Sequence, residues 1–199
     1  MIGQAYLEDR REASRRSLIL VMAILLGSAL VFTLLTAPFT DLLGESRGAV
    51  PSVYHAMAAF IYLVVGTVGL YLAWQLWTGR VRSVADLQLL STVSATLAFL
   101  AIVAGNWLYI YYRAKDPASP RSYFLANAPA VHRIFFEFKE FAALFTLPIT
   151  VAAAFLLWYY GAEALDRKWM RYTLAVLFTL SFFYLAVAFG LGAAVTKLR

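Results

Sequence analysis

The sequence predicts an all-α membrane protein, a bundle of five transmembrane helices in a single membrane domain over residues 1–199. Three observations predict this class. Hydrophobic residues make up 62% of the 199 residues, whereas soluble domains are about half apolar. Charged residues make up only 14%, and the mean hydropathy is +0.72. The apolar residues also gather in five runs, each with about the 20 residues that a membrane-crossing helix needs.

Each run is bounded by residues that break helices or carry charge. The first follows N-terminal arginines, as in a signal peptide. Its apolar stretch is longer than a signal h-region and no A-x-A cleavage site follows it, so we expect a retained helix. Proline, glycine and charged residues separate this run from the second, and basic or proline-rich turns separate the others. The predicted spans are Ser17–Thr36, His55–Trp77, Leu87–Tyr112, Val131–Tyr160 and Tyr172–Thr196.

We interpret the basic residues of the chain as determinants of its membrane topology. The 17 Lys and Arg residues give a net charge of +6, and they lie mostly between the apolar runs, where membrane proteins place charges for topology and headgroup contact. We therefore expect no nucleic-acid partner. The N-terminal cluster predicts an integral protein of the cytoplasmic (inner) membrane with its N-terminus in the cytoplasm and its C-terminus outside. This cluster consists of Arg10, Arg11, Arg15 and Arg16.

Several kinds of chemistry are excluded by what the sequence lacks. There is no cysteine, which removes disulfides, iron–sulfur clusters and thiolate metal sites. The sequence contains no glycine-rich phosphate loop, no G-x-S-x-G, no H-E-x-x-H and no EF-hand loop. We expect an electron-transfer or accessory subunit of a membrane oxidoreductase rather than a stand-alone enzyme.

Small residues recur at helical spacing in four of the spans. Membrane helices pack through such stripes, because lipid gives helices no hydrophobic reason to associate. The stripes therefore predict which side chains face the interior of the bundle. They are Ala59, Gly66, Gly69 and Ala73; Ser91, Ser94, Ala98, Ala101 and Gly105; Ala143, Thr146, Thr150 and Ala154; and Ala175, Thr179, Ala186 and Gly190.

The two histidines of the chain both fall on these stripes. His55 precedes Ala73 by eighteen residues, or five full turns, and His132 precedes Thr150 by the same number. Both stand at the start of parallel spans, at the same side of the membrane. Counted from the aromatic residues at the other ends of the two spans, their depths differ by about 9 Å.

Two inward imidazoles on parallel helices predict the axial ligands of one haem b. The basic residues Arg113, Arg121 and Arg133 lie on the same side, where they are expected to bind the haem propionates. Zinc or copper would need carboxylates to complete its ligands, because there is neither a third histidine nor a cysteine. The remaining alternative is a pair of structural histidines with no cofactor.

Charges inside the fourth span are the second unusual feature, since ionisable residues within a membrane are functional by default. Helical phase brings Lys139 and Glu140 nearer to the face of His132 and turns Glu137 away. We expect Glu140 to contact quinone or to pass a proton near the haem. Alternatively, these charges are interfacial and reach toward the headgroups. The aromatic residues at the end of the third span are interpreted as an interfacial belt; they are Trp107, Tyr109, Tyr111 and Tyr112.

These features predict a b-type cytochrome subunit that carries electrons between quinone and a partner redox protein through one bis-histidine haem near the outer face. Other membrane or peripheral redox subunits and lipid are the expected partners. The alternative is a cofactor-free accessory or structural subunit of a larger membrane complex. A small transporter is a third, weaker interpretation, because neither an inverted repeat nor a pair of broken helices is evident.

Overall fold

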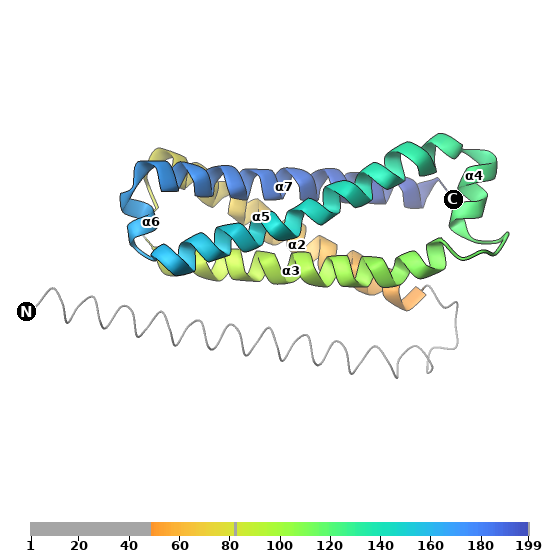
Figure 1. The fold of residues 1–199 in the computed structure, drawn as a ribbon, viewed down its shortest axis with the longest axis horizontal. Helices are drawn as coiled ribbons and strands as arrows, with labels where there is room; N and C mark the ends of the chain where they lie inside the picture. Colours follow the sequence, from red (N-terminus) through yellow and green to blue (C-terminus); the bar gives the residue numbers. More distant parts are fainter. Residues whose placement is uncertain (1–48, 82, 199) are drawn as a thin grey trace, which may run out of the picture. The chain divides into compact units, whose positions relative to one another are not determined.

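A computed structural model describes residues 49–81 and 83–198, and every regular element in these residues is a helix (Figure 1). The all-α prediction is confirmed for this part of the chain. The long helices are α2 (Ala49–Thr78), α3 (Val84–Tyr112), α5 (Glu137–Tyr160) and α7 (Lys168–Lys197). The short elements are α4 (Pro120–Asn127), α6 (Glu163–Asp166) and η1 (Val131–Phe136), a π-helical segment that continues directly into α5.

Four helical stretches in the described residues are long and apolar enough to cross a membrane, which supports an integral membrane protein. Three of them begin three or four residues before the predicted starts, and the one that η1 and α5 form together has the predicted bounds. The predicted span Ser17–Thr36 lies outside the described residues, so a total of five helices stays a prediction. The four stretches are Pro51–Thr78, Val84–Tyr112, Val131–Tyr160 and Lys168–Lys197.

A short turn with clear sequence signals joins α2 to α3. Gly79 has a φ of 69°, a conformation that glycine adopts at little cost. The amide of Arg80 donates to the carbonyl oxygen of Gln75 at 2.8 Å, as in a Schellman motif. The hydroxyl oxygen of Ser83 then accepts from the amide of Asp86 at 3.3 Å, which caps the start of α3. The two helices therefore run antiparallel.

The four long helices form a ring in which each has two neighbours. The neighbouring pairs are α2–α3, α3–α5, α5–α7 and α7–α2. Successive long helices alternate in direction, so this part of the chain is an up-down-up-down four-helix bundle. The helices α2 and α5 run parallel and occupy opposite corners of the ring. The helix α4 lies at the end where α3 finishes, and α6 lies at the opposite end (Figure 1).

Polar side chains join the helices inside the bundle. The Nε2 atom of Gln88 on α3 donates to the carbonyl oxygen of Leu157 on α5 at 3.1 Å. The hydroxyls of Tyr62 on α2 and Ser181 on α7 lie 2.8 Å apart, and both side chains are buried. In a membrane, an apolar helix surface contacts lipid as favourably as it contacts another helix. Hydrogen bonds of this kind therefore help to hold the helices together.

Candidate functional site

Both histidines and the charged residues of α5 lie toward the end of the bundle where α3 finishes and η1 begins. We call this set of side chains the histidine cluster. Its members come from α2, from α3 and the residue that follows it, and from η1 and α5, while α7 packs behind them. They are His55, Tyr109, Tyr112, Arg113, His132, Glu137, Lys139 and Glu140.

The ring of His55 is held against α3. Its Nδ1 atom lies 2.9 Å from the carbonyl oxygen of Ala101. Because a carbonyl oxygen only accepts, Nδ1 carries the hydrogen and Nε2 carries the lone pair of the neutral ring. Glycine at position 105 makes this approach possible. A Cβ atom at Gly105 would lie 3.0 Å from Cε1 of His55, closer than the van der Waals separation of about 3.5–4.0 Å.

His132 lies in η1 and is 4% exposed. Its Nδ1 atom lies 3.0 Å from the hydroxyl oxygen of Tyr112 on α3. Its Nε2 atom lies 3.7 Å from Oε1 of Glu137, which is beyond hydrogen-bonding distance. The rings of Phe136 and Tyr112 stack with their centroids 3.9 Å apart and fill the space beside the imidazole. In both histidines, therefore, Nδ1 is the ring nitrogen that is hydrogen-bonded to another residue of the chain.

Arg113 and Glu137 cover this end of the bundle on its exposed side. The Nη2 atom of Arg113 lies 2.7 Å from Oε1 of Glu137, and the two side chains are 41% and 44% exposed. The guanidinium also lies over the ring of Tyr109, 4.5 Å from its centroid. Exposed ion pairs contribute only about 0–1 kcal/mol, so this pair orients the surface charges rather than holding the fold together.

Lys139 and Glu140 are adjacent on α5 and point to different neighbouring helices. Lys139 lies along Gly192 of α7, where an added Cβ would be 3.3 Å from the lysine Cε atom. Its ammonium group is 5.1 Å from the ring centroid of Phe136. Glu140 is partly buried and faces Tyr109 of α3, with which it interacts electrostatically. The two charges attract each other, so together they link α3, α5 and α7.

The two histidines contact α3 at different levels. His55 lies against Ala101 and Gly105, whereas His132 bonds to Tyr112. Gly105 and Tyr112 are seven residues apart, which corresponds to roughly 10 Å along a helix.

The expected propionate-binding arginines lie around one of the two histidines. His132 experiences their positive charge together with the negative charge of Glu137. Lys139 is the charged side chain that acts on His55. The structure thus brings the expected cations to the outer end of the cluster and a lysine to its inner end. The arginines are Arg113, Arg121 and Arg133.

Two tyrosines of the cluster were interpreted from the sequence only as part of an aromatic belt. Tyr112 is 7% exposed and bonds to His132, and Tyr109 interacts electrostatically with Glu140. A signal for this role is present in the sequence. Gly105, Tyr109 and Tyr112 follow one another at spacings of four and three residues, so they share the face of α3 that carries the histidine contacts.

Comparison of the chain with protein-family models, with curated proteins and with solved structures gives no match. Within residues 49–81 and 83–198, no three or more His, Cys, Asp or Glu side chains are grouped so that they could hold a metal ion. A cofactor that needs two axial nitrogens is the kind that the histidine cluster could accept, because its two imidazoles both leave Nε2 unbonded to the described side chains.

Proposed function

We propose that this chain is a membrane-embedded electron-transfer subunit that binds one haem b through the Nε2 atoms of His55 and His132. The observation that carries the proposal is the hydrogen bond at Nδ1 of each ring, to the Ala101 carbonyl and to the Tyr112 hydroxyl. Histidines that bind metals usually donate their second ring N–H to such a partner, which fixes the ring and leaves the other nitrogen for the metal.

The positions of the two helices also support a shared haem. Adjacent packed helices are 8–10 Å apart, so helices at opposite corners of a four-helix ring are roughly 14 Å apart. This wider separation suits a flat macrocycle with an imidazole on each face better than direct helix contact does. The histidines come from α2 and from the α5 side of the ring, which are opposite corners.

Coordination of one iron by both rings requires the separation of about 10 Å along α3 to close. The segment that carries His132 contains two features at which helices bend, the π-helical turn η1 and Pro148 inside α5. Bending there changes the tilt of η1 and shifts His132 relative to α3. We therefore expect haem binding to change the tilt of η1 relative to α3.

Haem, when bound, supplies reversible one-electron chemistry at a potential set by its ligands, its burial and nearby charges. The chain's own residues contribute the rest. The guanidinium groups of Arg113, Arg121 and Arg133 would hold the haem propionates through charge-assisted hydrogen bonds. Glu140 passes a proton or contacts quinone. A single haem needs a donor and an acceptor, so we propose quinone and a partner redox protein for these roles, with the haem near the outer face.

A second function, that of a cofactor-free accessory subunit in a larger membrane complex, is favoured by a different observation. The stacked rings of Tyr112 and Phe136 already pack against His132, and the Tyr112 hydroxyl holds its Nδ1 atom, without a cofactor. The visible spectrum of the purified protein separates the two proposals. A reducible Soret band with an α-band supports the haem protein. A colourless protein that copurifies with redox partners supports the accessory subunit, and a colourless protein that moves solute into liposomes supports a transporter.

For topology, we expect the N-terminus of the chain to lie in the cytoplasm, because four arginines precede the first predicted span. The α4 end of the bundle and the C-terminus then lie outside the cytoplasmic membrane. Reporter fusions after Arg121 and after Lys197 should be active on the outer side. A fusion after Gly79, in the turn between α2 and α3, is the matched control and should report the cytoplasm. Cytoplasmic reporters at Arg121 and Lys197 would reverse the orientation.

For Glu140, we expect replacement by Gln to leave the fold intact and to weaken the dependence of the haem midpoint potential on pH. The substitution keeps the side-chain shape next to Tyr109, but it removes the group that can take up a proton when the haem is reduced. Potentiometric titration at several pH values measures the effect. Glu163→Gln, on α6 at the opposite end, is the control. An unchanged pH dependence in Glu140→Gln would show that Glu140 is only interfacial.

A further inference from the structure

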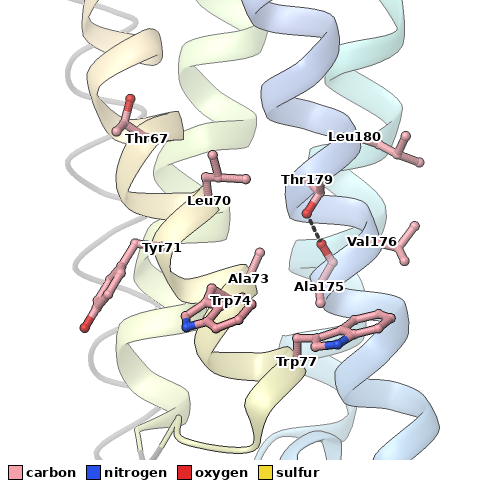
Figure 2. A pocket seen from close by; sticks show the side chains of 10 residues that line it. All are labelled: Thr67, Leu70, Tyr71, Ala73, Trp74, Trp77, Ala175, Val176, Thr179 and Leu180. Carbon is pink, nitrogen blue, oxygen red and sulfur yellow. Dashed lines mark hydrogen bonds between the residues drawn. The ribbon is translucent and has the colours of Figure 1, made fainter.

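An apolar groove runs along the outer surface of the bundle between α2 and α7 (Figure 2). Its volume is about 740 Å³, and most of its lining residues are exposed. Trp74 and Trp77, which are 60% and 53% exposed, lie on its α2 side. The lining residues that the argument uses are Thr67, Trp74, Trp77, Ala175, Thr179 and Leu180.

The length of the groove matches one leaflet of a bilayer. Along α2 the lining extends from Thr67 to Trp77, which is ten residues or roughly 15 Å of helix rise. The hydrocarbon core of a membrane is about 30 Å thick, so one leaflet contributes about 15 Å. A chain that enters at the membrane surface beside Trp77 therefore reaches the middle of the bilayer at Thr67.

The chemistry of the lining favours a hydrocarbon chain over a polar ring such as a quinone head. Three hydroxyls line the groove. The side chain of Tyr71 points away from it, and each of the two threonine hydroxyls already donates to its own helix (Figure 2). Thr67 donates to the carbonyl oxygen of Leu63 at 2.9 Å, and Thr179 donates to that of Ala175 at 2.8 Å (Figure 2). Neither threonine hydroxyl hydrogen is left to bond the oxygen of a ligand.

Cations and aromatic rings stand at the surface end of the groove. Trp77 stacks on Tyr172 of α7 with the ring centroids 4.6 Å apart. The ammonium group of Lys168 lies 5.6 Å from the centroid of Tyr172. The Nη2 atom of Arg171 is 3.6 Å from the position that a Cβ would take at Gly79, two residues after Trp77. Counted along α7, Arg171 lies about one helical turn and Lys168 about two turns before Ala175, where the lining of the groove begins.

We propose that this groove binds an anionic phospholipid, with one acyl chain between α2 and α7 and the phosphate against Lys168 and Arg171. A chain of leaflet length fills the apolar part, and the lipid charge complements the two cations. The sequence-based orientation places this end of the bundle at the cytoplasmic leaflet, where anionic lipids give a negative surface potential. The proposal does not depend on whether the chain binds haem.

Quenching of tryptophan fluorescence by brominated lipids tests the proposal. The protein, with Trp107 and Trp169 replaced by Phe so that Trp74 and Trp77 dominate the surface signal, is placed in mixed vesicles of phosphatidylglycerol and phosphatidylcholine. Either lipid carries the bromine. We expect brominated phosphatidylglycerol to bind about fivefold or more tightly than brominated phosphatidylcholine, since each surface cation contributes about this factor. Equal quenching by the two lipids would overturn the proposal.

Three further measurements identify the site and the occupant. Lys168→Gln should lower the preference about fivefold, whereas Lys197→Gln, at the other end of α7, should leave it unchanged. Thr179→Phe fills the groove and should reduce quenching by both lipids. An unchanged preference in Lys168→Gln, or unchanged quenching in Thr179→Phe, places the lipid elsewhere and contradicts the proposal. Displacement of brominated phosphatidylglycerol by an equal amount of decylubiquinone would identify quinone as the occupant and would also overturn it.

Discussion

Replacing either His55 or His132 with alanine is expected to abolish the six-coordinate, low-spin spectrum of the haem. Each substitution removes one axial nitrogen, which leaves a five-coordinate high-spin iron or a protein without haem. The visible spectrum of each purified variant should show a blue-shifted Soret band or none. Insertion should be normal, because it depends on the apolar length of the helices and on their internal hydrogen bonds and not on the cofactor.

Two control variants separate loss of a ligand from a general disturbance of this end of the bundle. Tyr112→Phe removes the hydroxyl that bonds to Nδ1 of His132 but keeps both axial nitrogens. It should retain a low-spin spectrum with a changed midpoint potential, since partners of this kind tune metal-binding histidines. Asn106→Ala changes an exposed side chain and should have no effect. If both histidine variants keep the low-spin spectrum of the parent, the ligands lie elsewhere.

The transmembrane helices of the described region were predictable because lipid imposes a simple requirement. Each span must be apolar over about 20 residues and must satisfy its backbone internally. Three of the four predicted starts lie three or four residues too late. A helix extends beyond its apolar stretch as far as the residue that caps it. Capping by Ser83 begins α3 three residues before the first predicted position. The basic first turn of α7, from Lys168, is likewise helical although it is not apolar.

Small residues were a partial guide to the inward faces. Ala73 of α2, Ala98 of α3 and Ala175 of α7 are buried as expected. Thr179 and Gly190, on the predicted stripe of α7, are exposed, and that part of the prediction is wrong. The hydroxyl of Thr179 bonds to its own helix, so the residue can face lipid without leaving a polar group unsatisfied. Spacing alone cannot distinguish such a position from a packed one.

The histidines and charged residues of the histidine cluster were singled out from the sequence, whereas its two tyrosines and the pairings between its members were not. Helical phase was expected to turn Glu137 away from His132, but its carboxylate lies 3.7 Å from Nε2 of that residue. The cause is η1, in which the amide of Glu137 bonds to the carbonyl of His132, five residues earlier. A π-helical turn aligns residues five apart instead of four. No residue pattern in this segment predicts the π-helical turn.

Gly105 is expected to be the position at which the smallest substitution has the largest effect on cofactor binding. An added methyl group would lie 3.0 Å from Cε1 and 3.1 Å from Nδ1 of His55. The imidazole then has to move away from α3, and its hydrogen bond to Ala101 is stretched or lost. Gly105→Ala should therefore weaken haem binding about 10- to 100-fold, the range found when a partner that orients a metal-binding histidine is removed.

Gly190→Ala on α7 is the matched control for this prediction, because an added Cβ there has no neighbouring atom within 4 Å. Both substitutions gain about 1 kcal/mol of helix propensity, so the difference between them isolates the contact with His55. Titration of haem into each apoprotein gives the two dissociation constants, and thermal unfolding in detergent checks that both variants fold. If Gly105→Ala binds haem as tightly as Gly190→Ala does, His55 does not take the position against α3 from which its Nε2 atom is presented to iron.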